Sequence, residues 1–308
     1  MPHIPVLLAE VLAAFPVQSG QVFLDGTVGY GGHAKAILEQ VQGSFTYIGL
    51  DRDEQALTHC RQQFAGDARV RLIHASYKDA GTVLTEQGIE LVDHILLDLG
   101  ASSPQFDESG RGFSFQANGP LDMRFDRSQG NTAADVLNTY KEQDLEEVIR
   151  EYGEERHAKR IARAIVTARK QQSFAETEQL AKVVEQGIPR RLWPKRIHPA
   201  TRVFQALRIE VNDELETIRL ALPMLIERLK PGGYIGIISF HSLEDRIVKH
   251  TFRQAAKSCV CPPESIICTC KTTPQLRLIT KRPIIATDEE QTQNPRSRSA
   301  KLRIAQKL

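Results

Sequence analysis

Residues 21–32 read QVFLDGTVGYGG, and this stretch decides the fold. Its first five residues are mostly apolar and predict a short strand, and the glycines that follow end the strand and let the backbone approach a ligand closely. A helix is predicted over residues 34–41, and a second strand over residues 45–50 ends at Asp51. This order of strand, glycine-rich turn, helix and strand is typical of an α/β protein with a parallel, doubly wound sheet.

The same alternation continues along the chain. Further strands are predicted at residues 70–73, 91–97 and 234–240. Two late runs, residues 275–279 and 300–304, could form an antiparallel pair at the edge of the sheet. Loops are predicted at residues 259–274 and 288–299.

The strand pattern stops in the middle of the chain, where the sequence is helical and basic. We therefore predict a discontinuous core of residues 1–106 and 212–308, interrupted by a helical insert of residues 107–211. An amphipathic helix over residues 213–229 leads back into the core and ends at a Lys-Pro-Gly-Gly turn, residues 230–233.

Charge is unevenly distributed. The whole chain carries a net charge of +2, but residues Arg150 to Arg208 hold 14 Lys and Arg against 6 Asp and Glu, a net +8. This asymmetry fits nucleic-acid binding and fits a solvated helix face equally well. The composition, 41% hydrophobic and 25% charged, is that of a globular protein. No apolar run approaches the roughly 20 residues that span a bilayer, and the N-terminus lacks a secretory signal, so we expect a cytoplasmic location.

The glycine-rich loop and Asp51 predict a nucleoside cofactor. Asp51 lies 20 residues beyond Gly31, the interval at which an acid binds ribose hydroxyls. The loop reads D-G-T-x-G-x-G-G, whereas a pyrophosphate loop requires G-x-G-x-x-G, so S-adenosyl-methionine is favoured over a nicotinamide. Tyr77, just beyond the third strand, could flank the adenine or could be an ordinary packing aromatic.

Longer motifs point to a family. They are LLDLGASSPQ (residues 96–105), RGFSF (111–115), GPLDMR (119–124), YGEER (152–156), HPATRVFQALRI (198–209) and SFHSLEDR (239–246). Together they closely resemble the family of ribosomal RNA small subunit methyltransferase H, also called MraW. The resemblance covers nearly the whole chain and fails only around residues 255–290, where the cysteines lie.

The resemblance implies a Rossmann-like class I methyltransferase sheet. It also implies an activity: transfer of a methyl group from S-adenosyl-L-methionine to the N4 amine of one decoding-centre cytidine, position 1402, of 16S rRNA in the small ribosomal subunit. The sulfonium already activates the leaving group, so this chemistry requires no metal. A DNA amino-methyltransferase would carry a Pro-Pro-aromatic element after Asp98, which this chain lacks. A nicotinamide oxidoreductase would need a pyrophosphate loop, and a non-catalytic RNA-binding module would not need the glycine loop together with Asp51.

The resemblance also assigns site residues. The implied cofactor contacts are Gly31, Gly32, His33, Asp51, Tyr77, Asp98 and Gln105. The family often has Phe at the position of Tyr77, and either residue supplies an aromatic face. Our candidates for cradling the cytosine amine are Asp98, Ser102 and Ser103. His241, at the end of the fifth strand, has a substrate-side role or a structural one.

Two further groups of residues are candidates for binding. Arg156, Lys159, Arg160 and Arg163 recur at helical spacing, and residues 190–196 are basic around Trp193, which suits phosphate contact and base stacking or, for Trp193, plain packing.

The second group is formed by cysteines. Four of the five cysteines lie in two C-x-C pairs: Cys259, Cys261, Cys268 and Cys270. In a cytoplasmic protein such a cluster suggests metal ligands before disulfides, but the pairs are tighter than the usual C-x₂₋₄-C zinc spacing. Thiols in a loop and a structural zinc site both remain open.

Overall fold

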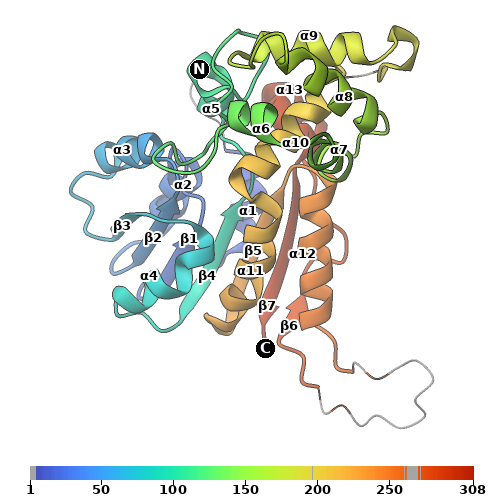
Figure 1. Ribbon diagram of the computed structural model, residues 1–308. Coiled ribbons are helices and arrows are strands. Elements are labelled where there is room, and N and C mark those ends of the chain that lie inside the picture. The colour runs from blue at the N-terminus through green and yellow to red at the C-terminus, as the bar shows by residue number, and fades with distance from the viewer. Residues whose placement is uncertain (1–4, 196, 260, 262–269, 271) are drawn as a thin grey trace. The chain divides into compact units, whose positions relative to one another are not determined.

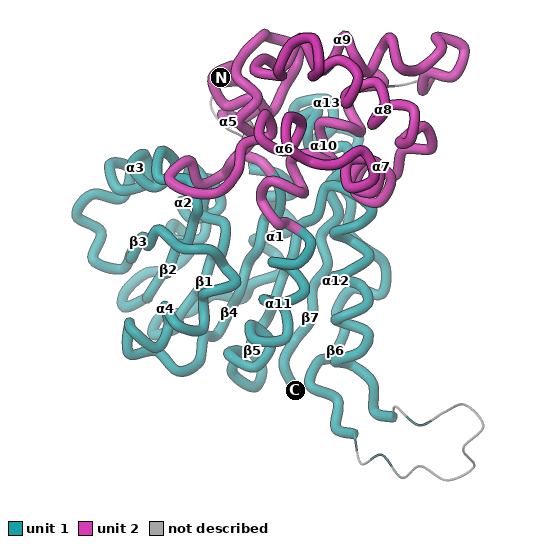
Figure 2. Tube along the Cα trace, viewed as in Figure 1, with its two compact units in different colours: residues 1–100, 215–308 teal, residues 101–214 magenta. Residues whose placement is uncertain are grey.

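The computed structural model describes residues 5–195, 197–259, 261, 270 and 272–308. The chain divides into two compact units (Figure 2): residues 1–100 with 215–308, and residues 101–214. The insert predicted at 107–211 falls inside the second unit.

Within the described residues the first unit holds a seven-stranded sheet in the order β3-β2-β1-β4-β5-β7-β6 (Figure 1). The strands are β1 (Val22–Asp25), β2 (Thr46–Asp51), β3 (Val70–His74), β4 (Val92–Asp98), β5 (Leu229–Ser239), β6 (Leu276–Leu278) and β7 (Lys301–Lys307). Strands β1 to β5 are parallel, and β7 pairs antiparallel with both β5 and β6. The predicted strands and the antiparallel edge pair are confirmed.

Helices flank this sheet because its central strands are apolar on both faces. They are α1 (Leu8–Ala14), α2 (Gly32–Gln40), α3 (Glu54–Gln63), α4 (Ala80–Glu86), α11 (Glu214–Glu227), α12 (Ser242–Ala255) and α13 (Asp288–Gln293), with 3₁₀ turns η1 (Tyr77–Asp79) and η4 (Pro295–Ser299). The core between the layers includes Phe23, Tyr47, Leu96 and Leu302, each fully buried.

Two local predictions were wrong. The turn expected at residues 230–233 lies inside β5, because the strand is bulged there: the register against β4 shifts between Val92 and His94, and Gly232 takes a φ of +84°. The loop expected at residues 288–299 instead contains α13 and η4. Its helix forms because the Thr287 hydroxyl caps it by accepting the N–H of Glu290 at 3.2 Å.

The second unit is helical around a core of its own. Its helices are α5 (Ser103–Asp107), α6 (Ala133–Thr139), α7 (Glu142–Glu151), α8 (Ala158–Arg169), α9 (Thr177–Gly187) and α10 (Ala200–Asn212), with 3₁₀ turns η2 (Ser109–Arg111) and η3 (Arg190–Leu192). Each longer helix turns an apolar stripe inward, and Ile149, Ile161, Leu180 and Leu207 meet in that core.

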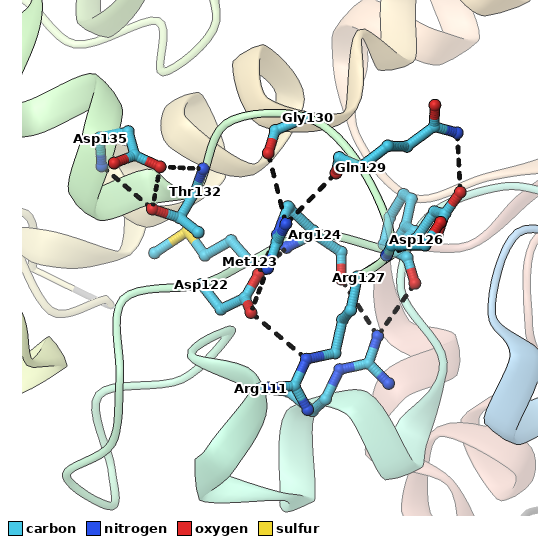
Figure 3. A network of polar contacts seen from close by, with 12 residues as sticks. Arg111, Asp122, Met123, Arg124, Asp126, Arg127, Gln129, Gly130, Thr132 and Asp135 are labelled. Atoms are coloured by element: carbon cyan, nitrogen blue, oxygen red, sulfur yellow. Dashed lines mark hydrogen bonds and ion pairs between the residues drawn. The ribbon is translucent and has the colours of Figure 1, made fainter.

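The RGFSF and GPLDMR segments form a buried polar network in the second unit (Figure 3). Arg111 donates to the carbonyls of Arg124 and Phe125 at 3.1 and 3.2 Å, and the Asp122 carboxylate accepts from Arg124 at 2.7 Å. Gly112 has a φ of +75°, and a Cβ there would stand 2.2 Å from the carbonyl oxygen of Pro120. The two segments therefore pack with their backbones in direct contact. This packing gives a structural reason for the glycine and the charged residues of the two motifs.

Candidate functional site

Three carboxylates end three neighbouring strands of the first unit. Asp25 ends β1, Asp51 ends β2 and Asp98 ends β4, and β1 lies between β2 and β4 in the sheet. Because these strands are parallel, the three residues share the carboxyl edge, where open α/β sheets bind their ligands. Asp51 and Asp98 were predicted site residues. Asp25 was not, although its position at a strand end was the same signal.

Asp51 organises the glycine-rich loop. One carboxylate oxygen accepts the N–H of Gly29 at 2.8 Å, and the other accepts the N–H of Asp53 at 2.8 Å. Burial raises the pKa of Asp51 to about 6, against the opposing effect of those N–H donors. The N–H of Arg52 also interacts with this carboxylate, so backbone donors hold Asp51 in place at the end of β2.

Asp25 is fixed by its own neighbours. Its carboxylate accepts the Tyr47 hydroxyl at 2.6 Å and the N–H of Thr27 at 3.0 Å. Burial raises the pKa of Asp25 to about 6, although the Tyr47 hydrogen bond lowers it. Asp25 therefore shapes the start of the loop and adds negative charge to the edge.

Asp98 differs from the other two acids. Its N–H donates to the Thr27 hydroxyl at 2.6 Å, which anchors the end of β4 to the loop. Within the described part of the chain, its Oδ1 atom is buried and has no hydrogen-bond partner. Burial, and then the charges of Asp25 and Glu244, raise the pKa of Asp98 well above its usual value. A buried acceptor without a donor is a feature that a bound ligand would complete.

His33 and the two loop glycines lie at the same edge. His33 is buried; its Nε2 donates to the Val6 carbonyl at 3.0 Å, and its Nδ1 lies 3.8 Å from Oδ2 of Asp98. Gly31 is the N-cap residue of α2 with a φ of +77°, which favours glycine, and a Cβ on Gly32 would be 3.2 Å from Pro5. The ring of His33 is therefore oriented by the backbone and faces Asp98.

Tyr77 packs against the start of the same loop. It is the first residue of η1, directly beyond β3, and is half-buried. A Cβ on Gly26 would stand 2.8 Å from the Cβ of Tyr77, so the loop passes this close only because residue 26 is glycine.

His241 follows β5, the neighbour of β4, and is built into the first turn of α12. Its Nδ1 accepts the N–H of Glu244 at 3.5 Å, and the Glu244 carboxylate accepts the N–H of His241 at 3.3 Å, which forms a reciprocal cap. Its Nε2 lies 3.2 Å from Oε1 of Glu244. This geometry favours the structural alternative, in which His241 positions the buried Glu244.

Ser102, Ser103 and Gln105 belong to the second unit, at the start of α5. Ser102 is the N-cap residue, and the Gln105 side chain accepts its N–H at 2.9 Å. Gln105 is buried. The other predicted site residues, from Gly31 to His241, all belong to the first unit.

Residues 1–308 match the model of the MraW methylase family. The chain belongs to the MraW methylase family. A protein of Pelobacter propionicus named ribosomal RNA small subunit methyltransferase H is 50% identical over 309 residues, covering 99% of this chain and 98% of its own. One of the same name from Heliobacterium mobile is 48% identical and covers 99% of both chains. A solved rRNA methylase from Streptococcus thermophilus is 12% identical, with a TM-score of 0.42 over 98% of this chain and 92% of its own.

The second unit of this methylase has an exposed basic surface. On α8, Ile161, Ala162 and Ile165 are buried, as predicted from their spacing. The basic side chains outside that apolar stripe are exposed: Arg156, Lys159, Arg160, Arg163, Arg190, Arg191 and Lys195. Arg196 lies outside the described residues.

Trp193 of the methylase is half-buried beside this surface. Its indole N–H donates to the carbonyl of Ile188 at 2.9 Å, and the Arg190 guanidinium stands 5.9 Å from its ring centre. The ring also packs against the helical core. These contacts favour the packing role of Trp193 over base stacking.

Acidic residues gather on another part of the methylase's second unit. A cavity of about 270 Å³ is lined by Tyr140, Asp144, Glu147, Val148, Glu151, Tyr152 and Glu210. Burial and a hydrogen bond to Glu210 raise the pKa of Tyr140 to about 12. Positive charge is thus concentrated on α8 and η3, and negative charge on α7. Among the described residues, no helix of the methylase is long and apolar enough to cross a membrane.

Proposed function

We propose that this methylase transfers a methyl group from S-adenosyl-L-methionine to the N4 amine of one decoding-centre cytidine of 16S rRNA. The observation that carries the proposal is family membership over all 308 residues, with relatives about half identical from end to end and named for the small subunit rRNA. The substrate would be the RNA within the small ribosomal subunit, in the cytoplasm.

The carboxyl edge of the first unit fits the cofactor. The carboxylate of Asp51 suits ribose hydroxyls, the left-handed glycines allow the nucleoside to approach, and Tyr77 offers an aromatic face to the adenine. Asp25 and Asp51, each with a pKa of about 6, give this edge a negative potential near pH 7 that complements a sulfonium. The bound cofactor supplies an activated methyl group, and the protein residues supply binding and orientation.

Asp98 is the residue that we propose for the substrate amine. The lone pair of the cytosine N4 is delocalised into the ring, so the amine attacks poorly until it is held in line and its N–H groups are bound. The buried Oδ1 of Asp98 is an acceptor of the required kind. Ser102 and Ser103 follow Asp98 closely in sequence and are proposed to help cradle the amine. His241 is proposed as a positioning residue that acts through Glu244, whose charge raises the pKa of Asp98.

The second unit is proposed to hold the RNA. Its basic helix α8 and turn η3 present cations at spacing suited to phosphates, which supply affinity without sequence information. Residues 107–211 of this unit are accordingly proposed as the RNA-recognition insert.

Mass spectrometry of 16S rRNA nucleosides tests the proposal. Cells that lack this protein should lose one N4-methylcytidine, and the intact gene should restore it, whereas a gene with Asp98→Ala should not. An unchanged nucleoside profile in cells without the protein would refute the proposed reaction.

A further inference from the structure

Three cysteine thiols converge beside the end of α12. The sulfur atoms of Cys259, Cys261 and Cys270 all lie within 4.8 Å of one another, and those of Cys259 and Cys270 are 3.8 Å apart. Cys259 is exposed and the other two are half-buried. We propose that these thiols bind one zinc ion in a structural site.

The sulfur spacing matches zinc coordination. With Zn–S bonds of about 2.3 Å, two sulfurs of a tetrahedral site are about 3.8 Å apart. The Cys259–Cys270 distance equals that value, and the remaining separations exceed it by no more than about 1 Å. A disulfide would instead require a separation of about 2.05 Å.

The backbone also prepares one sulfur for a metal. The N–H of Cys261 points at the sulfur of Cys259 at 3.4 Å. An N–H donor stabilises the thiolate, which is the form that binds zinc. Cys268 lies outside the described residues, so the proposed site consists of Cys259, Cys261 and Cys270.

The position of the cluster explains what the metal would do. The N–H of Gln275 donates to the carbonyl of Ala255 at 2.7 Å, so the long connection from α12 to β6 begins and ends at one point. A metal bound by Cys259, Cys261 and Cys270 would close this connection at a second point and contribute folding free energy.

The site would be remote from the cofactor edge. Helix α12 starts at the carboxyl edge, just after β5, and its 14 residues run back along the sheet for about 21 Å (Figure 1). The thiol cluster follows its last turn, at the opposite edge from Asp98. Zinc removal should therefore leave cofactor binding unchanged.

Metal analysis of the full chain tests the proposal. Protein purified under reducing conditions without chelator should contain about one zinc per chain. Cys259→Ser, Cys261→Ser and Cys270→Ser should each lose most of the zinc. The matched control is Cys60→Ser, which removes a buried thiol of α3 and should keep the zinc.

Two further measurements keep the test decisive if a variant fails to fold. Wild-type protein stripped of metal should bind one equivalent of Co²⁺ with the absorption of a tetrahedral thiolate complex. S-adenosyl-methionine affinity, measured on the same samples, should change less than about twofold, so the outcome is separate from the proposed methyl transfer. Less than about 0.1 zinc per chain without a tetrahedral Co²⁺ spectrum, or a Cys259–Cys270 disulfide in fresh protein, would overturn the site.

Discussion

Replacing Asp51 with Asn is the sharpest test of the cofactor edge. Asn keeps the shape of the side chain, but one of the two N–H donors, from Gly29 or Asp53, would then face an amide NH₂. Leaving that donor unsatisfied should lower the free energy of unfolding by about 1–3 kcal/mol. Loss of a charge-assisted bond to ribose should cost a further 1.5–3 kcal/mol in binding, about ten- to a hundredfold in the dissociation constant for S-adenosyl-methionine.

The control for this variant is Asp93→Asn at the opposite edge of the same sheet. The Asp93 carboxylate also accepts a backbone N–H, from Val22 at 2.8 Å, and a Lys230 ammonium at 2.9 Å. It should lose similar stability and keep its cofactor affinity. Calorimetric titration and thermal unfolding of both variants measure the two effects. If folded Asp51→Asn protein binds the cofactor within twofold of wild type, the ribose assignment is wrong.

Four further predictions concern the site and the insert. Asp98→Ala should reduce methyl transfer by at least about a hundredfold. It should also raise the melting temperature at pH 7, because it removes a buried carboxyl group whose Oδ1 has no hydrogen-bond donor. Near-normal turnover would exclude Asp98 from the site. Burial raises the pKa of Asp25 and Asp51 to about 6, so both lose their charge below that pH. Binding of the cationic S-adenosyl-methionine should then weaken more than binding of the neutral product S-adenosyl-homocysteine. Binding titrations at pH 7.5 and 5.5 that show equal losses of affinity for the two ligands would contradict this. The insert should favour assembled small subunits over deproteinised 16S RNA at matched salt, and equal methylation of both would mean that local sequence suffices. Charge reversal should lower the salt slope of RNA binding by about 0.7–0.9 per lost phosphate contact. Lys182→Glu, which removes a lysine already ion-paired with Glu178, should change the slope little. The residues to reverse are Arg160, Arg163 and Arg191.

The strands could be predicted because each is a short apolar run that ends at a turn or an acid. The bulge in β5 could not, since it depends on the register between β4 and β5, which local sequence does not encode. The helix α13 was missed because its residues are polar throughout and only the Thr287 cap marks its start.

The site was predictable where residue type and position coincide. Asp51 and Asp98 follow apolar strands directly. Asp25 also ends an apolar strand, but its hydrogen bond with Tyr47 of the neighbouring strand could not be predicted from sequence. His241 is an unusual N-cap residue, so the capping pattern His-Ser-Leu-Glu was not recognised. The meeting of Cys259 and Cys270 depends on the path of the chain between them and could not be read from their spacing.

The strand order has a consequence for how the protein is made. Strands β1 to β4 come from the first hundred residues, but β5, which covers the free side of β4, follows only at Leu229–Ser239. The chain emerges from the ribosome N-terminus first, so the edge of β4 stays unpaired while the whole second unit is synthesised. This edge includes the apolar residues Ile95 and Leu97, which are fully buried in the folded protein. An unpaired edge of this kind is prone to pair with other chains. Early termination anywhere before β5 should therefore yield an aggregating fragment, and premature stop codons in this gene should act through insolubility.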